Sequence, residues 1–133
     1  MELNSIDLKK YSRQLILKNI GVAGQKKIFE SKILIIGAGG LGCPLMLYLS
    51  YSGVGNLGIV DHDKIEISNL SRQVLFTKKD LGKLKVSVSK KFIRKINKKI
   101  NIKTYAKKIN KENIHDIAKN YDFICDGTDK FKS

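Results

Sequence analysis

The feature that most constrains the fold is an apolar run that leads directly into closely spaced glycines. Lys32–Ile36 reads KILII, which is typical of a strand buried on both faces, and GAGGLG follows at 37–42. In a GxGxxG turn the first glycine permits the tight bend, the second lets a phosphate approach the backbone, and the third lets the helix pack against the strand. A turn without a ligand is the simpler alternative. We predict a helix over Leu41–Ser52 and a nucleotide bound at the turn by Gly37, Gly39, Gly40 and Gly42.

Apolar strands alternate with helices along the rest of the chain. Strands are predicted at Asn56–Val60, Ile100–Tyr105 and Asp122–Cys125, with helices over Gly82–Asn97 and Lys111–Lys119. Such alternation implies parallel strands joined by right-handed crossovers. The predicted fold class is α/β, a Rossmann-like doubly wound, mainly parallel sheet that is truncated after about four strands. One edge of that sheet is expected to be exposed or unfinished.

The first part of the chain carries only helical patterns. Ser5 is expected to cap a helix that runs to Leu17, and Gly21–Glu30 is predicted to form a second helix. We therefore predict an N-terminal helical segment over residues 1–31 and a nucleotide-binding Rossmann-like domain over residues 32–133, incomplete at its C-terminus.

The charge of the chain is strongly positive. Lysine and arginine number 26 against 12 acidic residues, which gives a net charge of +14. The lysines are scattered along helical faces, so the sequence favours a solvated basic surface with weak nonspecific anion binding. No specific nucleic-acid partner is predicted, although a noncatalytic basic binding module is the reading that this charge suggests.

Neither membrane insertion nor zinc binding is indicated. The longest apolar run, around Leu41–Tyr51, is too short to span a bilayer and no leader opens the chain, so a soluble cytoplasmic protein is expected. Cys43 and Cys125 form no CxxC pair, which argues against a zinc site or a disulfide framework.

The segment DHDKIEISNLSRQ, at 61–73, carries polar side chains where a nucleotide would lie. Asp61 ends the second strand, the position from which a carboxylate accepts hydrogen bonds from ribose hydroxyls. Asn69 and Arg72 add donors for phosphates, and the arginine fork suits charge that develops during transfer. Alone, Asn69 would more often cap a loop and Arg72 would be a surface group. Together with the glycine turn, these residues favour ATP.

Two further candidates lie beyond this segment. Lys85 opens the long helix, where its charge can reach a phosphate, and Asp129 in DGTDK follows the fourth strand, where a carboxylate can hold Mg²⁺ shared with phosphates. Asp126 is expected instead to cap the turn after that strand. His62 and His115 show no partner pattern for catalysis or metal binding.

These motifs appear together in one known family. YSRQ at 11–14, GAGGLG, SNLSRQ at 68–73 and DGTDK at 126–130 make the chain similar, from Tyr11 to Phe131, to the ThiF/MoeB/HesA family of adenylyltransferases, relatives of ubiquitin-activating enzymes. The resemblance implies ATP-dependent activation of the C-terminal carboxylate of a small ubiquitin-like sulfur-carrier protein, as an acyl-adenylate, in thiamine or molybdenum-cofactor biosynthesis.

The resemblance also implies a role for each site residue. Asp61 would bind the ATP ribose, while Asn69, Arg72 and Lys85 would contact phosphates. Asp129 would hold Mg²⁺, and Arg13 would reach into the partner subunit's active site, which implies a homodimer. The residues implied to be catalytic are Arg13, Arg72, Lys85 and Asp129.

The chain departs from the family pattern in two ways. Lys130 stands where the family has an asparagine, and the family's paired CxxC zinc ligands and carrier-docking half are absent from this shorter chain. We therefore expect the N-terminal half of such an enzyme, either one part of a split enzyme or an inactive remnant. YSRQ and LFTKKD lean slightly toward the thiamine member. The alternative is an NAD-binding dehydrogenase fragment, suggested by GAGGLG together with Asp61.

Overall fold

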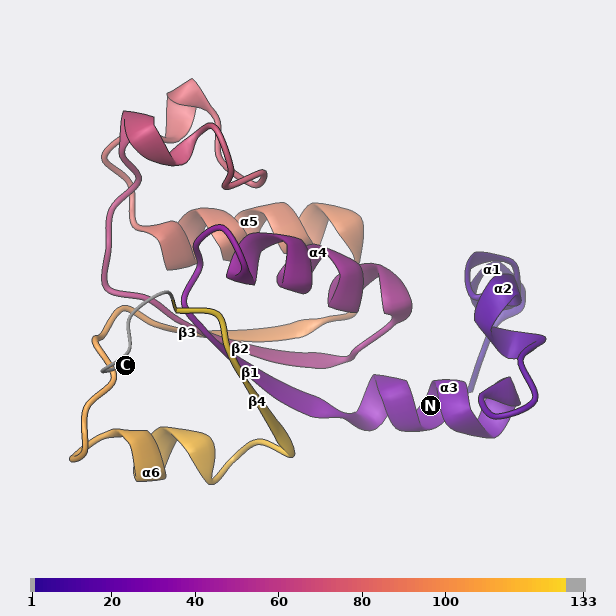
Figure 1. Ribbon diagram of the computed structural model, residues 1–133. Helices are drawn as coiled ribbons and strands as arrows, with labels where there is room; N and C mark the ends of the chain where they lie inside the picture. The colour runs from indigo at the N-terminus through magenta and orange to yellow at the C-terminus, as the bar shows by residue number, and fades with distance from the viewer. Residues whose placement is uncertain (1, 129–133) are drawn as a thin grey trace.

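A four-stranded parallel sheet forms the centre of the structure, a computed structural model that describes residues 2–128. The strands are β1 (Lys32–Ile36), β2 (Asn56–Val60), β3 (Asn101–Tyr105) and β4 (Phe123–Asp126), in the order β3-β2-β1-β4 (Figure 1). All three pairings are parallel. The predicted α/β Rossmann-like class is confirmed. The bounds of β1 and β2 are as predicted, and the other two strands begin one residue later.

Helices cover the two faces of this sheet, and an apolar core lies on each face. Helices α4 (Gly42–Ser52) and α5 (Lys85–Ile96) lie on one face, and α6 (Ile114–Ala118) lies on the other (Figure 1). In β1, Ile35 joins the core under α4 and α5, whereas Leu34 joins the core under α6. This two-sided burial explains why the strand reads as a continuous apolar run.

The N-terminal segment is correctly predicted as helical, but the first helix, predicted to run unbroken to Leu17, is divided in two. It contains α1 (Ser5–Lys10), α2 (Ser12–Leu15) and α3 (Gly21–Glu30). The chain leaves the helix at Tyr11, whose side chain is buried against Gly53. Asn4 rather than Ser5 caps α1, because its Oδ1 accepts the Asp7 N–H at 2.8 Å.

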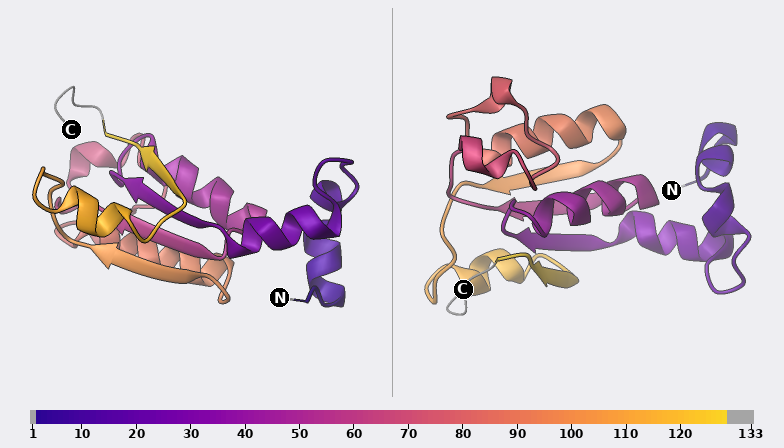
Figure 2. Two further views of the ribbon diagram at one scale, coloured as in Figure 1. Left: turned by 90° about the horizontal axis from the view of Figure 1, so that it is seen from below. Right: turned by 45° about the horizontal axis from the view of Figure 1, so that its top comes forward.

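The helices α1 and α2 lie at the end of the molecule away from α6 (Figure 2). Two buried or half-buried amides tie them to the domain. Gln14 Nε2 donates to Gln25 Oε1 and to the Ser52 carbonyl oxygen, each at 3.1 Å, and Gln25 Nε2 donates to the same carbonyl at 2.9 Å. The division of the chain at residue 31 stays a prediction.

Two other helix bounds differ from the prediction. The long helix begins at Lys85 rather than Gly82, because Gly82 adopts a left-handed φ of +81° in the preceding turn. Short 3-10 helices at Ile67–Asn69 and Lys78–Asp80, between β2 and α5, were not predicted. The helix predicted over Lys111–Lys119 is reduced to α6.

The edge of the sheet at β4 is exposed, as predicted. Within residues 2–128, β4 has β1 as its only neighbour, and Phe123 and Ile124 are 60% and 50% exposed. None of the helices in the described part of the chain is long and apolar enough to cross a membrane.

Candidate nucleotide-binding site

A cavity of about 690 Å³ opens at the carboxyl ends of β1 and β2. Its volume lies within the range of small-molecule sites, about 300–1,000 Å³. Seven residues that the sequence analysis selected line this cavity: Gly37, Gly39, Gly40, Asp61, Asn69, Arg72 and Lys85. The structure therefore brings together groups that lie up to 48 positions apart in the sequence, from Gly37 to Lys85.

The glycine turn is shaped by backbone contacts that exclude side chains. Gly37 has φ +96°, and a Cβ there would lie 3.1 Å from the Gly127 carbonyl carbon. A Cβ at Gly42 would overlap the Gly37 carbonyl oxygen. Gly42 is buried and does not line the cavity, so its role in the structure is to let α4 approach the turn. Gly39 and Gly40 face the cavity.

The Asp61 carboxylate is held in place by the backbone on both sides. Its Oδ2 accepts the Ala38 N–H and its Oδ1 accepts the Asp63 N–H, each at 2.8 Å. A carboxylate oxygen accepts more than one hydrogen bond, so lone pairs remain for ribose hydroxyls. The same side chain thus anchors the glycine turn to the end of β2 and presents acceptors to the cavity.

Cationic and amide groups stand opposite the glycine turn. The Arg72 stem lies against Gly40 and its Nη1 donates to the Ser68 carbonyl at 3.1 Å. Lys85 is buried, with Nζ 4.0 Å from Asp63 Oδ2. Asn69 Oδ1 accepts the Glu66 N–H at 2.8 Å, so Asn69 caps the loop as the simpler alternative expected, and the residue also lines the cavity.

Sequence reasoning missed several residues that line the cavity. Gln73 is 3% exposed, and its Oε1 has no hydrogen-bond partner within residues 2–128. Lys107 and Lys108 follow β3 and enter from the third strand. Their position at the carboxyl end of a predicted parallel strand was the available signal, because ligands of such sheets bind at that edge.

Comparison with known proteins decides the family. The model of the ThiF family matches residues 11–133. This chain belongs to the ThiF family. A probable molybdopterin-synthase adenylyltransferase from Gracilaria tenuistipitata var. liui is 47% identical over 131 residues, covering 98% of this chain and 37% of that protein. The adenylyltransferase and sulfurtransferase UBA4 of Saccharomyces cerevisiae (strain ATCC 204508 / S288c) is 47% identical over 124 residues, covering 92% of this chain and 28% of UBA4.

Two solved structures are similar to this chain. E. coli MccB, crystallised with AMPCPP and MccA, is 37% identical with a TM-score of 0.73, covering 80% of this chain and 33% of that chain. E. coli tRNA N6-threonylcarbamoyladenosine dehydratase, TcdA, in complex with ATP, has a TM-score of 0.87 at 19% identity, covering 98% of this chain and 53% of that chain, and shares the fold. The ThiF-family chain spans 28% to 37% of the length of the curated relatives named here.

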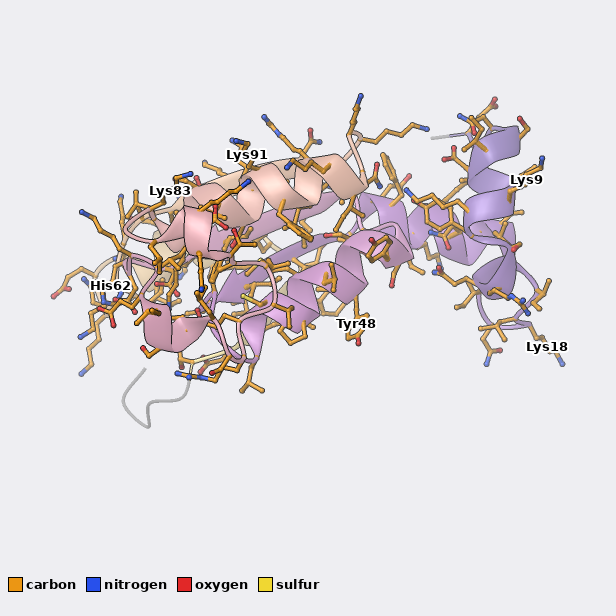
Figure 3. All side chains as sticks on the ribbon, turned by 90° about the horizontal axis from the view of Figure 1, so that it is seen from above. Lys9, Lys18, Tyr48, His62, Lys83 and Lys91 are labelled. Atoms are coloured by element: carbon orange, nitrogen blue, oxygen red, sulfur yellow. The ribbon has the colours of Figure 1, made fainter. Side chains whose placement is uncertain are left out.

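The ThiF-family chain also places acidic groups and a histidine at the mouth of the cavity. Ligand atoms of Asp61, His62 and Asp63 lie within 4.8 Å of one another, and His62 Nε2 lies 3.2 Å from Asp63 Oδ1. Figure 3 shows His62 at the opposite end of the molecule from Lys9 and Lys18. The structure places His62 beside two carboxylates, and the expectation that it takes no part in catalysis or metal binding stays a prediction.

The predicted metal ligand of this ThiF-family chain, Asp129, lies outside the described residues. Asp126 caps the turn after β4 as predicted, since its Oδ1 accepts both the Thr128 N–H at 3.0 Å and the Thr128 Oγ1–H at 2.6 Å. Thr128, which precedes the predicted magnesium ligand Asp129 in the sequence, lines the cavity.

Cys43 in this ThiF-family chain is poorly suited to act as a nucleophile. It is fully buried, and burial is the main cause that raises the pKa of its thiol to about 11. Its Sγ donates to the Ala38 carbonyl oxygen at 3.5 Å. The thiol thus stays neutral, as expected for a small apolar core residue.

Arg13 does not join the cavity of its own chain. It is exposed on α2, which lies at the end of the molecule remote from the carboxyl ends of the strands (Figure 2). The placement of α2 by Gln14 and Gln25 leaves Arg13 facing solvent. Its implied role in a partner subunit stays a prediction.

Proposed function

We propose that this domain binds ATP with Mg²⁺ in the cavity and that it adenylates the C-terminal carboxylate of a ubiquitin-like sulfur-carrier protein. The observation that carries this proposal is the convergence of the glycine turn, Asp61, Arg72 and Lys85 on one cavity of about 690 Å³. Backbone donors, a ribose acceptor and two cations are the groups that a nucleoside triphosphate requires.

The residues that line the cavity fit such a nucleotide. Gly39 leaves room for a phosphate, since a Cβ there would meet only Gln73 Nε2, at 3.7 Å. Asp61 stands at the end of β2 for the ribose hydroxyls. Arg72 lies beside Gly40 and Lys85 lies in the first turn of α5, so both cations can neutralise phosphate oxygens.

In the proposed reaction, an oxygen of the carrier carboxylate forms a bond to the α-phosphorus, and the bond from that phosphorus to pyrophosphate breaks. The chain contributes positioning and charge neutralisation, and no covalent nucleophile is needed. Arg72 and Lys85 hold the phosphates in line, and Asp61 fixes the nucleoside. Magnesium, when bound, supplies further neutralisation of the phosphates, with Asp129 as its proposed ligand.

The proposed partner is supported by the names of the relatives. The curated relatives are adenylyltransferases of the molybdopterin-synthase and MOCS3/UBA4 types, which favours the molybdenum-cofactor side over the thiamine side. We also propose a cytoplasmic homodimer in which Arg13 of one protomer serves the cavity of the other. This chain matches about a third of the length of these relatives. We therefore propose that adenylation by the whole enzyme also involves residues that this chain does not match.

Nucleotide binding is tested directly by calorimetry on the purified chain. ATP with Mg²⁺ is expected to bind, and Arg72→Ala is expected to weaken that binding while the fold is kept. Tight binding of NAD with indifference to ATP and Mg²⁺ would instead support the dehydrogenase alternative.

Adenylation is tested by ATP–pyrophosphate exchange that depends on a carrier protein ending in Gly-Gly. In this assay, the part of a relative that lies outside its match to this chain is supplied as a second chain. ATP binding without carrier-dependent exchange, even with that second chain, contradicts the adenylation step and leaves the nucleotide site intact.

A further inference from the structure

The basic residues of this chain are concentrated in one stretch. Residues 81–111 hold 12 of the 26 lysines and arginines and no acidic residue. Residues that carry the same charge repel one another, so such a stretch of a folded domain lies on the surface, where solvent separates the charges. In this protein the block covers α5, the loop after it, β3 and the start of the next loop.

Helix α5 and the turn after it expose four of these cations. The helix buries Val86, Ser89 and Ile93 against the sheet. The exposed basic residues of the helix form a stripe on the side away from the sheet, where Figure 3 shows Lys91 standing out: Lys91, Arg94 and Lys95. This stripe runs about 6 Å along the helix axis, and the exposed Lys98 follows in the turn after the helix.

A second cavity, of about 290 Å³, continues this stripe around the edge of the sheet at β3. Arg94 connects the stripe to the second cavity. It is exposed on the stripe and also lines the cavity together with Lys32 and Lys103. This cavity runs along β3 from Asn101 to Tyr105 and includes Lys32 and Asn56, which begin β1 and β2. It shares no lining residue with the nucleotide cavity.

The cations of this surface lack acidic partners. Within residues 2–128, no carboxylate lies within 4.0 Å of the side-chain nitrogens of Lys32, Lys91, Arg94, Lys95, Lys98 or Lys103, and no acidic residue lines the second cavity. The Asp122 carboxylate accepts a hydrogen bond from the backbone N–H of Lys32 at 3.0 Å. The neighbouring cations Lys83 and Lys99 are paired, with Asp80 at 3.9 Å and Asp7 at 3.2 Å. The charge of this surface is therefore available to an external anion.

Aromatic and amide groups line the cavity beside these cations. The hydroxyls of Tyr105 and Tyr121 are 2.9 Å apart, and Lys103 Nζ lies 5.4 Å from the centre of the Tyr105 ring. Tyr121 rests on the sheet at Gly58, where a Cβ would overlap its hydroxyl. Three asparagine amides complete the lining: Asn56, Asn101 and Asn120.

We propose that the face formed by α5 and the β3 edge binds single-stranded nucleic acid. A cationic track that runs into a groove with aromatic side chains has the composition of surfaces that hold single strands, through phosphate contacts and base stacking. The amides add donors and acceptors for base edges. Phosphate contacts carry no sequence information, so this proposal does not require a sequence-specific nucleic-acid partner. It is also independent of the nucleotide cavity.

The test measures fluorescence anisotropy of a labelled oligouridylate of about ten nucleotides, with the full chain, over a series of salt concentrations. Arg94→Gln/Lys103→Gln removes two cations from the face. Lys9→Gln/Lys18→Gln removes two exposed cations from the N-terminal segment and is the matched control. Circular dichroism and thermal unfolding check that both variants are folded.

The face variant is expected to bind the oligonucleotide about tenfold more weakly, and the slope of log Kd against log salt is expected to fall by about 1.4, for two lost phosphate contacts. The control variant is expected to bind like the parent protein. Equal weakening by both variants would show diffuse attraction and overturn the proposed face. Equal affinity for inorganic polyphosphate, or tighter binding of a duplex of the same sequence, would overturn the assignment to single-stranded nucleic acid.

Discussion

The Asp61 carboxylate accepts a hydrogen bond from the Ala38 backbone N–H at 2.8 Å. This contact joins the end of β2 to the glycine turn after β1, so the residue proposed to bind the ribose also orders the loop proposed to bind phosphates. A second bond, from the Asp63 N–H, holds the other oxygen of the carboxylate at 2.8 Å. Nucleoside and phosphate recognition are therefore expected to respond together to changes at Asp61.

Asp61→Asn is expected to weaken ATP binding by about tenfold to a hundredfold, because a charge-assisted hydrogen bond contributes about 1.5–3 kcal/mol. The amide keeps one acceptor oxygen but replaces the other with a donor that faces a backbone N–H. Calorimetry with ATP and Mg²⁺ measures the effect. Asp116→Asn, an exposed change on α6, is the control and is expected to leave affinity unaltered. Similar affinities for all three proteins would remove Asp61 from the nucleotide site.

Arg72→Ala is expected to weaken ATP binding by at least about tenfold and to leave the thermal unfolding temperature nearly unchanged. The side chain is exposed and makes one hydrogen bond, to the Ser68 carbonyl, so its main role is to contact ligand. Arg94→Ala provides a matched arginine control, because Arg94 lies outside the nucleotide cavity. The two variants are expected to separate ATP binding from oligonucleotide binding, and a loss of ATP affinity in Arg94→Ala would argue against two independent sites.

Gly42→Ala and Gly39→Ala are expected to fail in different ways. A Cβ at position 42 would overlap the Gly37 backbone, so the first variant is expected to lose about 1–3 kcal/mol of unfolding free energy or more. A Cβ at position 39 has ordinary clearance, with Gln73 Nε2 at 3.7 Å, but it points at the phosphate path. The second variant is expected to keep its stability in urea unfolding and to lose ATP affinity. Equal stability of the two variants would contradict the packing role assigned to Gly42.

The Cys43 thiol is expected to make stability fall at alkaline pH. Burial raises its pKa from 9.0 to about 11, so between these values the unfolded chain loses this proton while the folded chain keeps it. Unfolding free energy therefore decreases as pH rises from about 9 to about 11, by about 2–3 kcal/mol from this group, and the contribution is fully present below pH 9.

Urea unfolding of the parent protein and of Cys43→Ala at several pH values measures this effect. The alanine variant is less stable at every pH because it leaves a cavity, but its decline with pH is expected to be shallower. Parallel pH curves for the two proteins would show that Cys43 does not titrate differently in the two states.

The strands were predictable because their residues are buried on both faces. Leu34 and Ile35 serve the cores on opposite sides of the sheet, so each position of β1 had to be apolar and its bounds could be read directly. The helix predicted from Ser5 to Leu17 is instead interrupted at Tyr11, because a contact with a distant residue acts there. That ring packs on Gly53, a residue distant in sequence, and this contact overrides the local preference for one continuous helix.

The candidate site divides in the same way. Asp61, Asn69 and Arg72 lie in one short segment after a strand, so their pattern was visible in the sequence. Gln73 was overlooked although it follows Arg72 directly. It became a candidate only because its buried side-chain oxygen has no hydrogen-bond partner within residues 2–128. Lys107 and Lys108 became candidates only because β3 ends beside β2, which brings them to the cavity.

The residue pattern was enough to predict the parallel α/β fold and the glycine turn, because burial on both faces and the tight turn restrict which residues are allowed at each position. The ordered motifs were enough to indicate the family. Which distant side chains share a surface became visible only in the folded protein. The tertiary structure placed Lys32 in one cavity with Arg94 and Lys103, although Lys32 lies 62 positions before Arg94 in the sequence. Helical periodicity and strand order set that arrangement, since positions far apart in the sequence become neighbours only when these elements pack.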